Sequence, residues 1–588
     1  MDTSDILQKA NEYLKLETTP VFRQQIEDLL AKNDIDELSD RFYTELEFGT
    51  GGIRGVIGGG YNRINTFIIQ KTTQGLANYI NKAVPAGKGS VVIAYDSRRF
   101  SDVFAEEAAK ILCANGIKTF LFSSLRPTPE LSFAVRYLKA TSGIVITASH
   151  NPAEYNGYKV YWDDGGQITP PHDTGIVGEV RNVHGTGIRH ISKDEAIDSG
   201  MLVMIDSTVD TPFIDMVKKL SLRPELIRQQ GKNLKVVYTP LHGTGAMPVE
   251  RALSEMGINV IFVEEQKAPD GNFPTVKFPN PEEASAMKLA LDLAAKVNAD
   301  LVLGTDPDAD RLGIAVPNGK GYTLVTGNQL GALLLDYIVT TRKELGTLPK
   351  KAAFIKTIVT TELQRMMAEA NGVICYDVLT GFKYIGEKIR EFEAQENGPV
   401  FIFGGEESYG YLCGTDVRDK DAVSSATMTV EMAMYHVSQG RTVLQRLAQI
   451  YETYGYFQEI LISTYFKGQS GNQVMSGLMT AMRTQPFSTL AGQPVVLVKD
   501  YKDHTTLTMV TKAKIEDIEL PSSNVLQFIC GDGSIITARP SGTEPKIKFY
   551  ASCRSKPGVP LAEAKAAVTQ KLGLIKDELN KLIQSVTK

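Results

Sequence analysis

The sequence has few of the features that mark secreted or metal-stapled proteins. It contains five cysteines in 588 residues, and no two of them stand at the short spacing of a zinc or iron–sulfur site. Their odd number and their scatter exclude a disulfide framework. They instead predict free thiols in a reducing compartment.

Long apolar runs and long basic runs are also missing. No run is long enough to span a membrane, and residues 1–20 are charged without an apolar signal core. The net charge of -5 gives no sign of a nucleic-acid binder. We therefore expect a cytoplasmic protein, a monomer or weak homodimer, with neither a membrane nor a nucleic acid as partner.

The remaining composition describes an ordinary globular protein that is too long for a single core, so several domains are expected. Apolar strands that lead into loops and helices begin at 90–96, 234–240 and 352–357. This alternation predicts three comparable α/β units with largely parallel sheets. Residues 1 to about 45 are predicted to be helical. From about residue 456, spaced strand-like runs and a final helix over 561–585 predict a separate α+β domain.

One serine follows a buried strand directly. The segment Thr147-Ala148-Ser149-His150-Asn151-Pro152 comes after the apolar run 142–147 and ends in Asn-Pro, which favours a turn. Ser149 is thus expected on a tight loop at the mouth of the strand, with His150 beside it. Its hydroxyl could be a nucleophile if it is activated. The alternative is that it only satisfies the backbone of the turn.

Three carboxylates follow another predicted strand. Asp306, Asp308 and Asp310 stand at alternate positions, which in an extended segment point to the same side, and Pro307 disfavours a helix. Carboxylates this close repel one another unless a cation lies among them. An EF-hand is excluded because Arg311 takes the position of its required glycine, so Mg²⁺ is the expected ion. The alternative is a solvated acidic turn.

Three further loops carry polar residues. The glycine-dense loop 48–60 holds Arg54 and lacks the order of a dinucleotide site, and the chain has no Walker A sequence. Residues 403–410 place Glu407 and Ser408 where they could bond sugar hydroxyls. Residues 539–546 combine an arginine, two hydroxyls and a glycine, which suits a phosphate group. Each of these loops, taken singly, could be an ordinary turn.

Taken together and in this order, the motifs resemble those of the α-D-phosphohexomutase superfamily, the phosphoglucomutase and phosphomannomutase group. The resemblance runs from about residue 40 to the C-terminus. It implies an α/β fold of four domains around a central cleft, three similar α/β units with mixed, largely parallel sheets and a C-terminal α+β domain. Each domain would contribute one loop: phosphoserine, metal, sugar and phosphate, in the domains 1–207, 208–325, 326–455 and 456–588. The matching segments are 48–54, 147–152, 306–311, 405–410 and 539–545.

The resemblance also implies roles for individual residues. Ser149 would carry a phosphoryl group and, with the three aspartates, would hold Mg²⁺. Lys159 would move protons at the reacting hydroxyl, and His150 would support the serine. The implied catalytic residues are Ser149, His150, Lys159 and Arg54. The implied substrate-binding residues are Arg311, Lys383, Glu407, Ser408, Lys420, Arg539, Ser541, Gly542 and Thr543.

The function implied by the resemblance is the interconversion of glucose 1-phosphate and glucose 6-phosphate through a bound glucose 1,6-bisphosphate. The Glu-Glu-Ser sequence of the sugar loop favours the phosphoglucomutase and phosphopentomutase branch. A pentose-phosphate mutase, a phosphomannomutase and a non-catalytic sugar-phosphate sensor are the alternatives. The intact serine and aspartates argue against a sensor, and a serine hydrolase would need a Gly-x-Ser-x-Gly turn that the Ser149 segment does not have.

Overall fold

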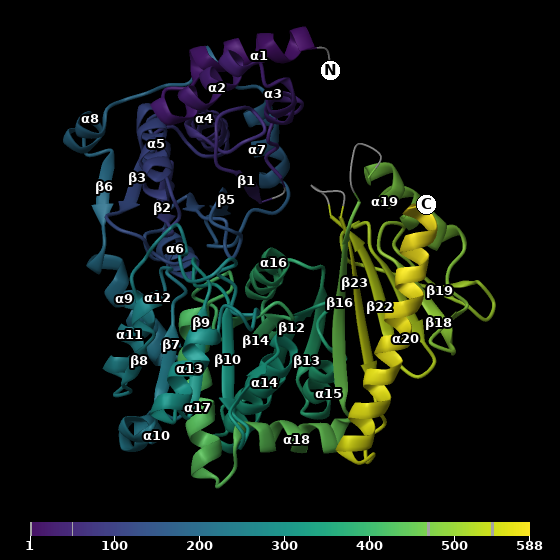
Figure 1. Ribbon diagram of the computed structural model, residues 1–588. Coiled ribbons are helices and arrows are strands. Elements are labelled where there is room, and N and C mark those ends of the chain that lie inside the picture. Colours follow the sequence, from purple (N-terminus) through teal and green to yellow (C-terminus); the bar gives the residue numbers. More distant parts are fainter. Residues whose placement is uncertain (1–2, 50, 467–470, 542–545, 588) are drawn as a thin grey trace. The chain divides into compact units, whose positions relative to one another are not determined.

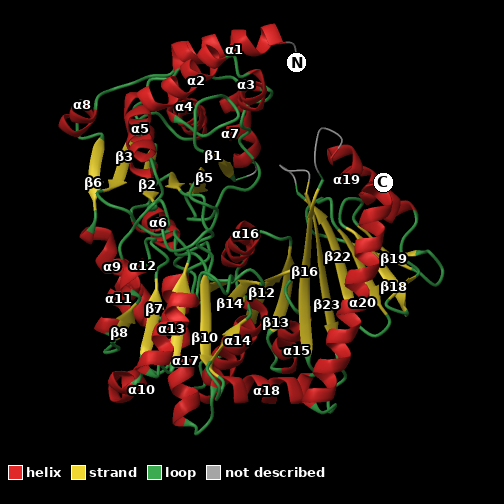
Figure 2. Ribbon diagram, viewed as in Figure 1, coloured by secondary structure: helices red, strands yellow, loops and turns green. Residues whose placement is uncertain are grey.

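The structure, a computed structural model, describes residues 3–49, 51–466, 471–541 and 546–587. The chain forms two compact units. The first holds the residues up to Ala353 together with Phe382–Gln439, and the second holds Phe354–Gly381 together with the residues from Gly440 onward. Helices and strands alternate along most of the chain (Figure 1, Figure 2). Among the described residues, no helix has both the length and the apolar character needed to cross a membrane.

Three helices open the first unit and confirm the helical prediction for this part of the chain. The buried residues of α1, Ile6, Ala10 and Tyr13, recur every three or four positions, so one face of the helix packs against the core. α2 begins with a proline, and the side chain of Asp34 caps α3 by accepting the amide of Glu37. Their bounds are α1 Thr3–Leu16, α2 Pro20–Lys32 and α3 Ile35–Phe42.

A mixed six-stranded sheet follows, in the order β1-β5-β4-β2-β3-β6. β2 pairs in parallel with β3 and β4, and β3 with β6, whereas β5 runs antiparallel to β1 and β4. β4 is buried along its whole length, which explains its apolar sequence. The strands are β1 Gly52–Val56, β2 Ser90–Tyr95, β3 Lys118–Phe122, β4 Ser142–Ile146, β5 Tyr155–Trp162 and β6 Leu202–Ile205. The helices are α4 Thr66–Ala83, α5 Ser101–Ala114, α6 Thr128–Tyr137, α7 His172–Arg181 and α8 Lys193–Asp198.

The glycine-dense segment 48–60 contains a strand, so its interpretation as a loop was wrong over Gly52–Val56. This strand, β1, pairs with β5 so that Arg54 stands opposite Gly157. A Cβ on Gly157 would lie 2.4 Å from the carbonyl oxygen of Thr147, so only glycine fits between the two segments. The glycine therefore lets the backbones approach closely, and β1 carries Arg54 toward the serine loop.

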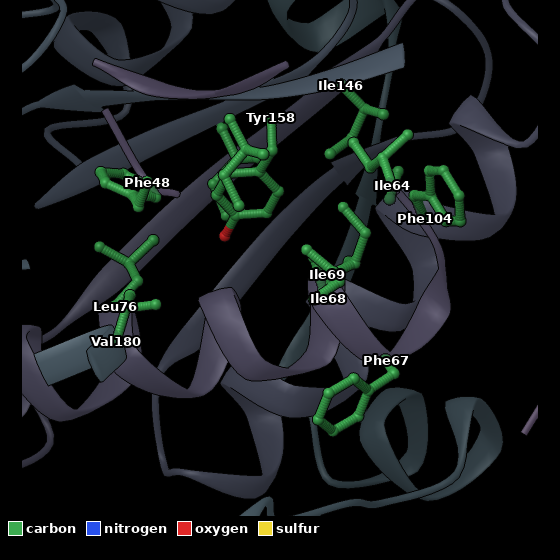
Figure 3. Close-up of a cluster of buried hydrophobic side chains, with 14 of the residues drawn as sticks. Phe48, Ile64, Phe67, Ile68, Ile69, Leu76, Phe104, Ile146, Tyr158 and Val180 are labelled. Atoms are coloured by element: carbon green, nitrogen blue, oxygen red, sulfur yellow. The ribbon is translucent and has the colours of Figure 1, made fainter. Parts of the chain in front are cut away.

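The core of this domain lies between the sheet and α4. Ile69 and Leu76 of α4 belong to one buried cluster with Tyr158 and Ile146 of the sheet, and all four side chains are fully buried (Figure 3). Phe104 of α5 belongs to the same cluster. This packing fixes the strands whose ends carry the site.

A second mixed sheet in the same unit has the order β11-β10-β9-β7-β8. β7 pairs in parallel with β8 and β9, and β10 runs antiparallel to β9 and β11. β9 is buried throughout and leads directly into the aspartate segment. The strands are β7 Val236–Thr239, β8 Val260–Phe262, β9 Leu301–Thr305, β10 Leu312–Pro317 and β11 Tyr322–Val325. The helices are α9 Ser207–Lys219, α10 Pro224–Gln230, α11 Ala246–Glu255, α12 Glu264–Lys267 and α13 Lys288–Val297.

The rest of the first unit consists of three helices and a β-hairpin. In the hairpin, Glu406 pairs with Gly410, and Glu407, Ser408 and Tyr409 form the turn between them. The elements are α14 Gly327–Glu344, α16 Phe382–Glu393, β14 Val400–Glu406, β15 Gly410–Leu412 and α17 Ala422–Ser438.

The second unit contains an antiparallel sheet in the order β16-β23-β22-β21-β18-β19-β20, with β17 paired to β18. Alternate residues of β23 are buried, as expected for a strand with one face against a core. This confirms the predicted α+β tail. The strands are β12 Ala352–Thr357 (which begins in the first unit), β13 Ile374–Val378, β16 Phe457–Tyr465, β17 Thr489–Leu490, β18 Gln493–Asp500, β19 Thr505–Thr508, β20 Lys514–Asp517, β21 Leu526–Cys530, β22 Ile535–Pro540 and β23 Lys546–Arg554. The helices are α15 Glu362–Ala370, α18 Val443–Tyr454, α19 Gly471–Thr484 and α20 Leu561–Thr587.

Two neighbouring residues of α5 provide a test of this core. Phe104 is fully buried and lies near Phe22 and Phe100, whereas Val103 on the same helix is 40% exposed. We expect Phe104→Ala to lower the free energy of unfolding by about 3–5 kcal/mol, because it leaves a cavity. Val103→Ala should cost less than about 1 kcal/mol. Chemical denaturation followed by circular dichroism measures both, and equal costs would contradict the packing described.

Candidate active site

The serine loop follows β4 directly, as predicted. Ser149 lies three residues beyond the end of this strand with a φ of 52°, in the left-handed region. Its amide donates to Thr147 Oγ1 at 2.8 Å, which fixes the turn locally. Ser149 is only 3% exposed. A residue that is not glycine keeps such a conformation only when its surroundings hold it.

Arg98 is one of the residues that hold the serine loop in this conformation. Its buried guanidinium donates to the carbonyl oxygen of Pro152 at 2.7 Å and to that of Tyr155 at 3.0 Å. It also donates to the carbonyl oxygens of Ser149 and Asn151. One side chain therefore bonds four carbonyl groups of the serine loop and the residues after it, using the planar fork of donors that only arginine has.

Asp96 joins Arg98 to the serine loop. Asp96 Oδ2 lies 3.3 Å from Arg98 Nε and accepts the hydroxyl of Thr147 at 2.7 Å. Asp96 Oδ1 accepts the hydroxyl of Ser101 at 2.8 Å. Burial raises the pKa of Asp96, although the charge of Arg98 opposes this shift. The carboxylate thus fixes the arginine and the turn at the same time.

The three aspartates converge in a turn between β9 and β10, so the predicted extended geometry was wrong. The turn closes on itself because the amides of Asp310 and Arg311 donate to Asp306 Oδ1 at 3.1 and 3.0 Å, and Ala309 has a φ of 48°. One carboxylate oxygen from each of Asp306, Asp308 and Asp310 lies within 4.8 Å of the others. The prediction that the three carboxylates converge is therefore confirmed. They converge because the chain forms a turn around them, and not because they alternate along an extended strand.

The serine hydroxyl meets this cluster. Ser149 Oγ donates to Asp306 Oδ2 at 2.7 Å and lies 3.1 Å from His150 Nδ1. The two loops are 157 residues apart in the chain. Burial and the positive charges of Arg311 and Arg54 lower the pKa of His150 well below its usual value. Because the single proton of the serine hydroxyl goes to Asp306, the serine oxygen can accept a hydrogen bond from the His150 ring.

Two lysines offset part of the negative charge. Lys159 Nζ donates to Asp308 Oδ2 at 2.8 Å and to Asp310 Oδ2 at 3.5 Å, and Lys420 Nζ lies 3.1 Å from Asp310 Oδ2. Burial opposes the ionisation of Asp308, but Lys159 outweighs it and lowers the pKa of this carboxyl. Burial and the two neighbouring aspartates raise the pKa of Asp306 well above its usual value. The cluster is therefore short of positive charge.

Two carboxylate oxygens of the cluster have no hydrogen-bond partner among the described residues. They are Asp308 Oδ1 and Asp310 Oδ1, and both are buried. A buried charged oxygen without a donor is costly. Hard carboxylate oxygens at this spacing are the ligands that Mg²⁺ prefers. The donor set thus fits a hard divalent cation.

Two arginines expected at the site lie beside it. Arg54 Nη1 donates to Asn151 Oδ1 at 3.2 Å, next to the serine. The side chain of Arg311 forms an ion pair with Glu282, with 2.6 Å between Nη1 and Oε1. Both guanidinium groups carry charge that can meet a phosphoryl group.

The hairpin turn that carries Glu407 and Ser408 rests on the aspartate turn. The amide of Leu312 donates to the carbonyl oxygen of Tyr409 at 2.9 Å, and Arg311 bridges to Gly410. A Cβ on Gly410 would lie 2.2 Å from Lys420 Cδ, so the glycine lets the lysine pass toward the cluster. Glu407 and Ser408 themselves are half-buried.

The two lysines expected beside this turn have different surroundings. Lys420 reaches Asp310 and also lies 3.0 Å from Asp419 Oδ1. Lys383 is the second residue of α16, where burial lowers its pKa against the opposing charges of Asp173 and Glu387. The structure thus joins Lys420 directly to the aspartate cluster and places Lys383 near the charges of Asp173 and Glu387.

The residues expected to grip a phosphate belong to the second unit. Arg539 lies in β22, and the amide of Ser541 donates to the carbonyl oxygen of Lys546 at 2.7 Å. Gly542 and Thr543 lie outside the described residues.

Several residues of the site were missed by sequence reasoning. Asp96 and Arg98 directly follow a strand that was predicted, so this charged pair at the end of the strand could have been recognised as part of the site. Thr128, whose hydroxyl donates to Asp308 Oδ2 at 3.0 Å, stands between two prolines and gave no such signal. Tyr161, two positions after Lys159 in β5, donates to Asp419 Oδ2 at 2.7 Å.

Comparisons with known proteins identify the family of this chain. Three family models match, described as Phosphoglucomutase/phosphomannomutase, alpha/beta/alpha domains I, II and III, over residues 45–185, 211–319 and 326–454. A phosphoglucomutase of Staphylococcus aureus is 38% identical over 90% of this chain and 94% of its own. One of Staphylococcus epidermidis is 36% identical over 90% of this chain and 94% of its own.

Solved structures share the fold. The phosphoglucomutase parafusin from Paramecium, in an open form, has a TM-score of 0.67 at 17% identity, covering 93% of this chain and 95% of its own. A phosphoglucomutase/phosphomannomutase family protein from Burkholderia thailandensis has a TM-score of 0.64 at 18% identity, covering 92% and 98%.

Adjacent arginines test the support of the serine loop. Arg98→Lys keeps a positive charge but cannot bond four carbonyl groups, so Ser149 should shift and kcat should fall about 10–100-fold. Arg99 makes one exposed contact, from its Nη2 to the carbonyl oxygen of Ala153 at 3.2 Å. Arg99→Lys should therefore keep kcat within about twofold. Steady-state kinetics of the two variants decides, and a fully active Arg98→Lys protein would show that the loop holds itself.

Proposed function

Because this chain belongs to the phosphoglucomutase/phosphomannomutase family, we propose that it is a phosphoglucomutase, which interconverts α-D-glucose 1-phosphate and glucose 6-phosphate. One observation carries the proposal: the hydroxyl of Ser149 lies 2.7 Å from Asp306 within a cluster of three buried aspartates. A nucleophile placed against a cation site suits the transfer of a phosphoryl group.

Ser149 is the proposed phosphoryl carrier. Phosphorylated Ser149 would give its phosphoryl group to a free hydroxyl of the sugar phosphate, which produces glucose 1,6-bisphosphate and the free serine. The serine would then take the other phosphoryl group, and the second monophosphate would leave. The proton of the attacking sugar hydroxyl must go to a base. We assign its transfer to Lys159, which lies in β5 beside the aspartates and would accept the proton only in its neutral amine form.

The aspartate cluster is the proposed magnesium site. Asp306, Asp308 and Asp310 would hold the ion together with the phosphorylated serine, since two of the carboxylates present oxygens without hydrogen-bond donors. When bound, Mg²⁺ acts as a Lewis acid that stabilises charge on the phosphoryl oxygens.

Positive side chains around the serine would steady the group in transfer. Arg54 lies beside the serine loop, and Arg311 is held by Glu282, a carboxylate that a phosphate could replace. His150 Nδ1 lies 3.1 Å from the serine oxygen and would keep it oriented. The two arginines would stabilise negative charge on the phosphoryl group during its transfer.

The sugar and its second phosphate need further contacts. Glu407 and Ser408 on the hairpin turn would hold the ring hydroxyls, with Lys420 and Lys383 as cationic neighbours. The phosphate that does not react would be gripped by Arg539, Ser541, Gly542 and Thr543, whose guanidinium, hydroxyls and backbone suit it.

The serine and the metal site are fixed, so one site must serve both ends of the sugar. The bisphosphate would therefore turn around between the two half-reactions, and glucose 1,6-bisphosphate is the proposed activator. We also propose a cytoplasmic monomer or weak homodimer with four domains, 1–207, 208–325, 326–455 and 456–588. A pentose-phosphate mutase and a phosphomannomutase are the competing substrate assignments.

Removing the serine hydroxyl tests the carrier. Ser149→Ala should lower kcat by at least about a thousandfold, because no other group can take the phosphoryl group. Ser97→Ala is a matched control, since the buried Ser97 hydroxyl has no hydrogen-bond partner among the described residues. Its activity should stay near that of the native protein. A coupled assay of glucose 6-phosphate formation compares the two, and normal turnover in Ser149→Ala would exclude the carrier role.

A substrate panel tests the sugar. If the hairpin turn contacts O3 and O4 of the ring, it discriminates only weakly between configurations at C2, so mannose 1-phosphate should be used, though less well than glucose 1-phosphate. Ribose 1-phosphate lacks that pair of hydroxyls on a six-membered ring and should be used least. The measurement is kcat/KM for all three at one concentration of bisphosphate. If ribose 1-phosphate exceeds glucose 1-phosphate by more than about tenfold, or about 1.4 kcal/mol of transition-state binding, the pentose assignment replaces ours.

A further inference from the structure

The two oxygens of the Asp308 carboxylate have different surroundings. Oδ2 accepts Lys159 Nζ at 2.8 Å and the hydroxyl of Thr128 at 3.0 Å. Oδ1 is buried and has no hydrogen-bond partner among the described residues. One oxygen is thus committed to protein donors, while the other is left for a ligand.

Thr128 grips Asp308 twice. It is the first residue of α6, its side chain is fully buried, and its amide donates to the carbonyl oxygen of Asp308 at 2.9 Å. The chain before it is anchored as well, because the guanidinium of Arg126 bonds both oxygens of Asp210, at 2.8 and 2.9 Å. The hydroxyl therefore stands at a fixed place relative to the aspartate.

The other two carboxylates are oriented by other means. Asp306 Oδ1 accepts two backbone amides of its own turn, and Asp310 Oδ2 faces both Lys420 and Lys159. Lys159 is shared between two aspartates and ends in a flexible ammonium, so it supplies charge with little direction. A threonine hydroxyl on a stiff β-branched side chain does supply direction.

We propose that Thr128 is a positioning residue for the metal site: its hydroxyl selects which oxygen of Asp308 faces the ion. The terminal torsion of an aspartate is soft, so without this hydrogen bond the carboxylate can rotate. Oδ1 would then face the metal position in only some of its orientations. Groups that orient metal ligands in this way typically change metal affinity 10–100-fold when they are removed. The proposal rests on the assignment of the aspartates as the magnesium site.

The test is metal binding by the full-length protein, measured by titration with Mn²⁺ followed by electron paramagnetic resonance, and with Mg²⁺ in competition. Thr128→Val keeps the shape of the side chain and removes the hydroxyl, so the Kd should rise at least about tenfold. Thr128→Ser restores the donor and should bind within about threefold of the native protein. Thr73→Val is the control, because the buried hydroxyl of Thr73 bonds Ile69 and Tyr158 in the core of the same domain. It should bind the metal normally.

Thermal unfolding separates orientation from stability. A Thr128→Val protein with a lowered Tm and an unchanged Kd would overturn the proposal and leave Thr128 a structural role. If Thr128→Val does not fold, Thr128→Ala replaces it, with the same expectation and the same contradiction. If the native protein binds no Mn²⁺ stoichiometrically, the magnesium site itself fails, and the proposal falls with it. Normal binding by the native protein and by Thr128→Val together would remove the proposal alone.

Discussion

Mutual repulsion among Asp306, Asp308 and Asp310 is the constraint on which the rest of the site depends. Two like charges within 4.8 Å repel by about 3–4 kcal/mol at the effective dielectric of a protein site. In the turn that joins β9 to β10, backbone amides, two lysines and the hydroxyls of Ser149 and Thr128 bond the carboxylates. On the proposed mechanism, a phosphoryl group on Ser149 would add a further charge of about -2, and a cation among the aspartates would offset it.

The fold meets this constraint by bringing together loops from separate sheets. The serine comes from the end of β4, Lys159 from β5, the aspartates from the end of β9 and Lys420 from the segment after the β14–β15 hairpin. The serine loop and the aspartate turn are each held by a side chain from another segment. Arg98 fixes the serine turn through four carbonyl groups, and Thr128 fixes one aspartate through its hydroxyl. The contacts that fix these loops also position the groups to which we assign the chemistry.

Much of this arrangement could be predicted from local pattern. The apolar run before Ser149 and the run before Asp306 both form buried strands. Both could be predicted because a short, continuous apolar run is typical of a buried strand. Three features could not be predicted. The aspartates meet in a curled turn instead of along a strand, since a φ of 48° at Ala309 is not signalled by alanine. Gly52–Val56 became a strand because β5 offers it an edge, and Thr128 reaches Asp308 across 180 residues of sequence. Such contacts are set by tertiary packing.

The most direct measurement follows a labelled phosphoryl group. Native protein is incubated with Mg²⁺ and glucose 1,6-bisphosphate that carries ³²P. One portion is digested, and the labelled peptide is identified. A second, undigested portion is mixed with unlabelled glucose 1-phosphate. The account predicts label on the peptide that contains Ser149, and its complete transfer to the sugar phosphate on mixing. Label on another peptide, or turnover without any labelled protein, would contradict the proposal that a serine held against three aspartates carries the phosphoryl group.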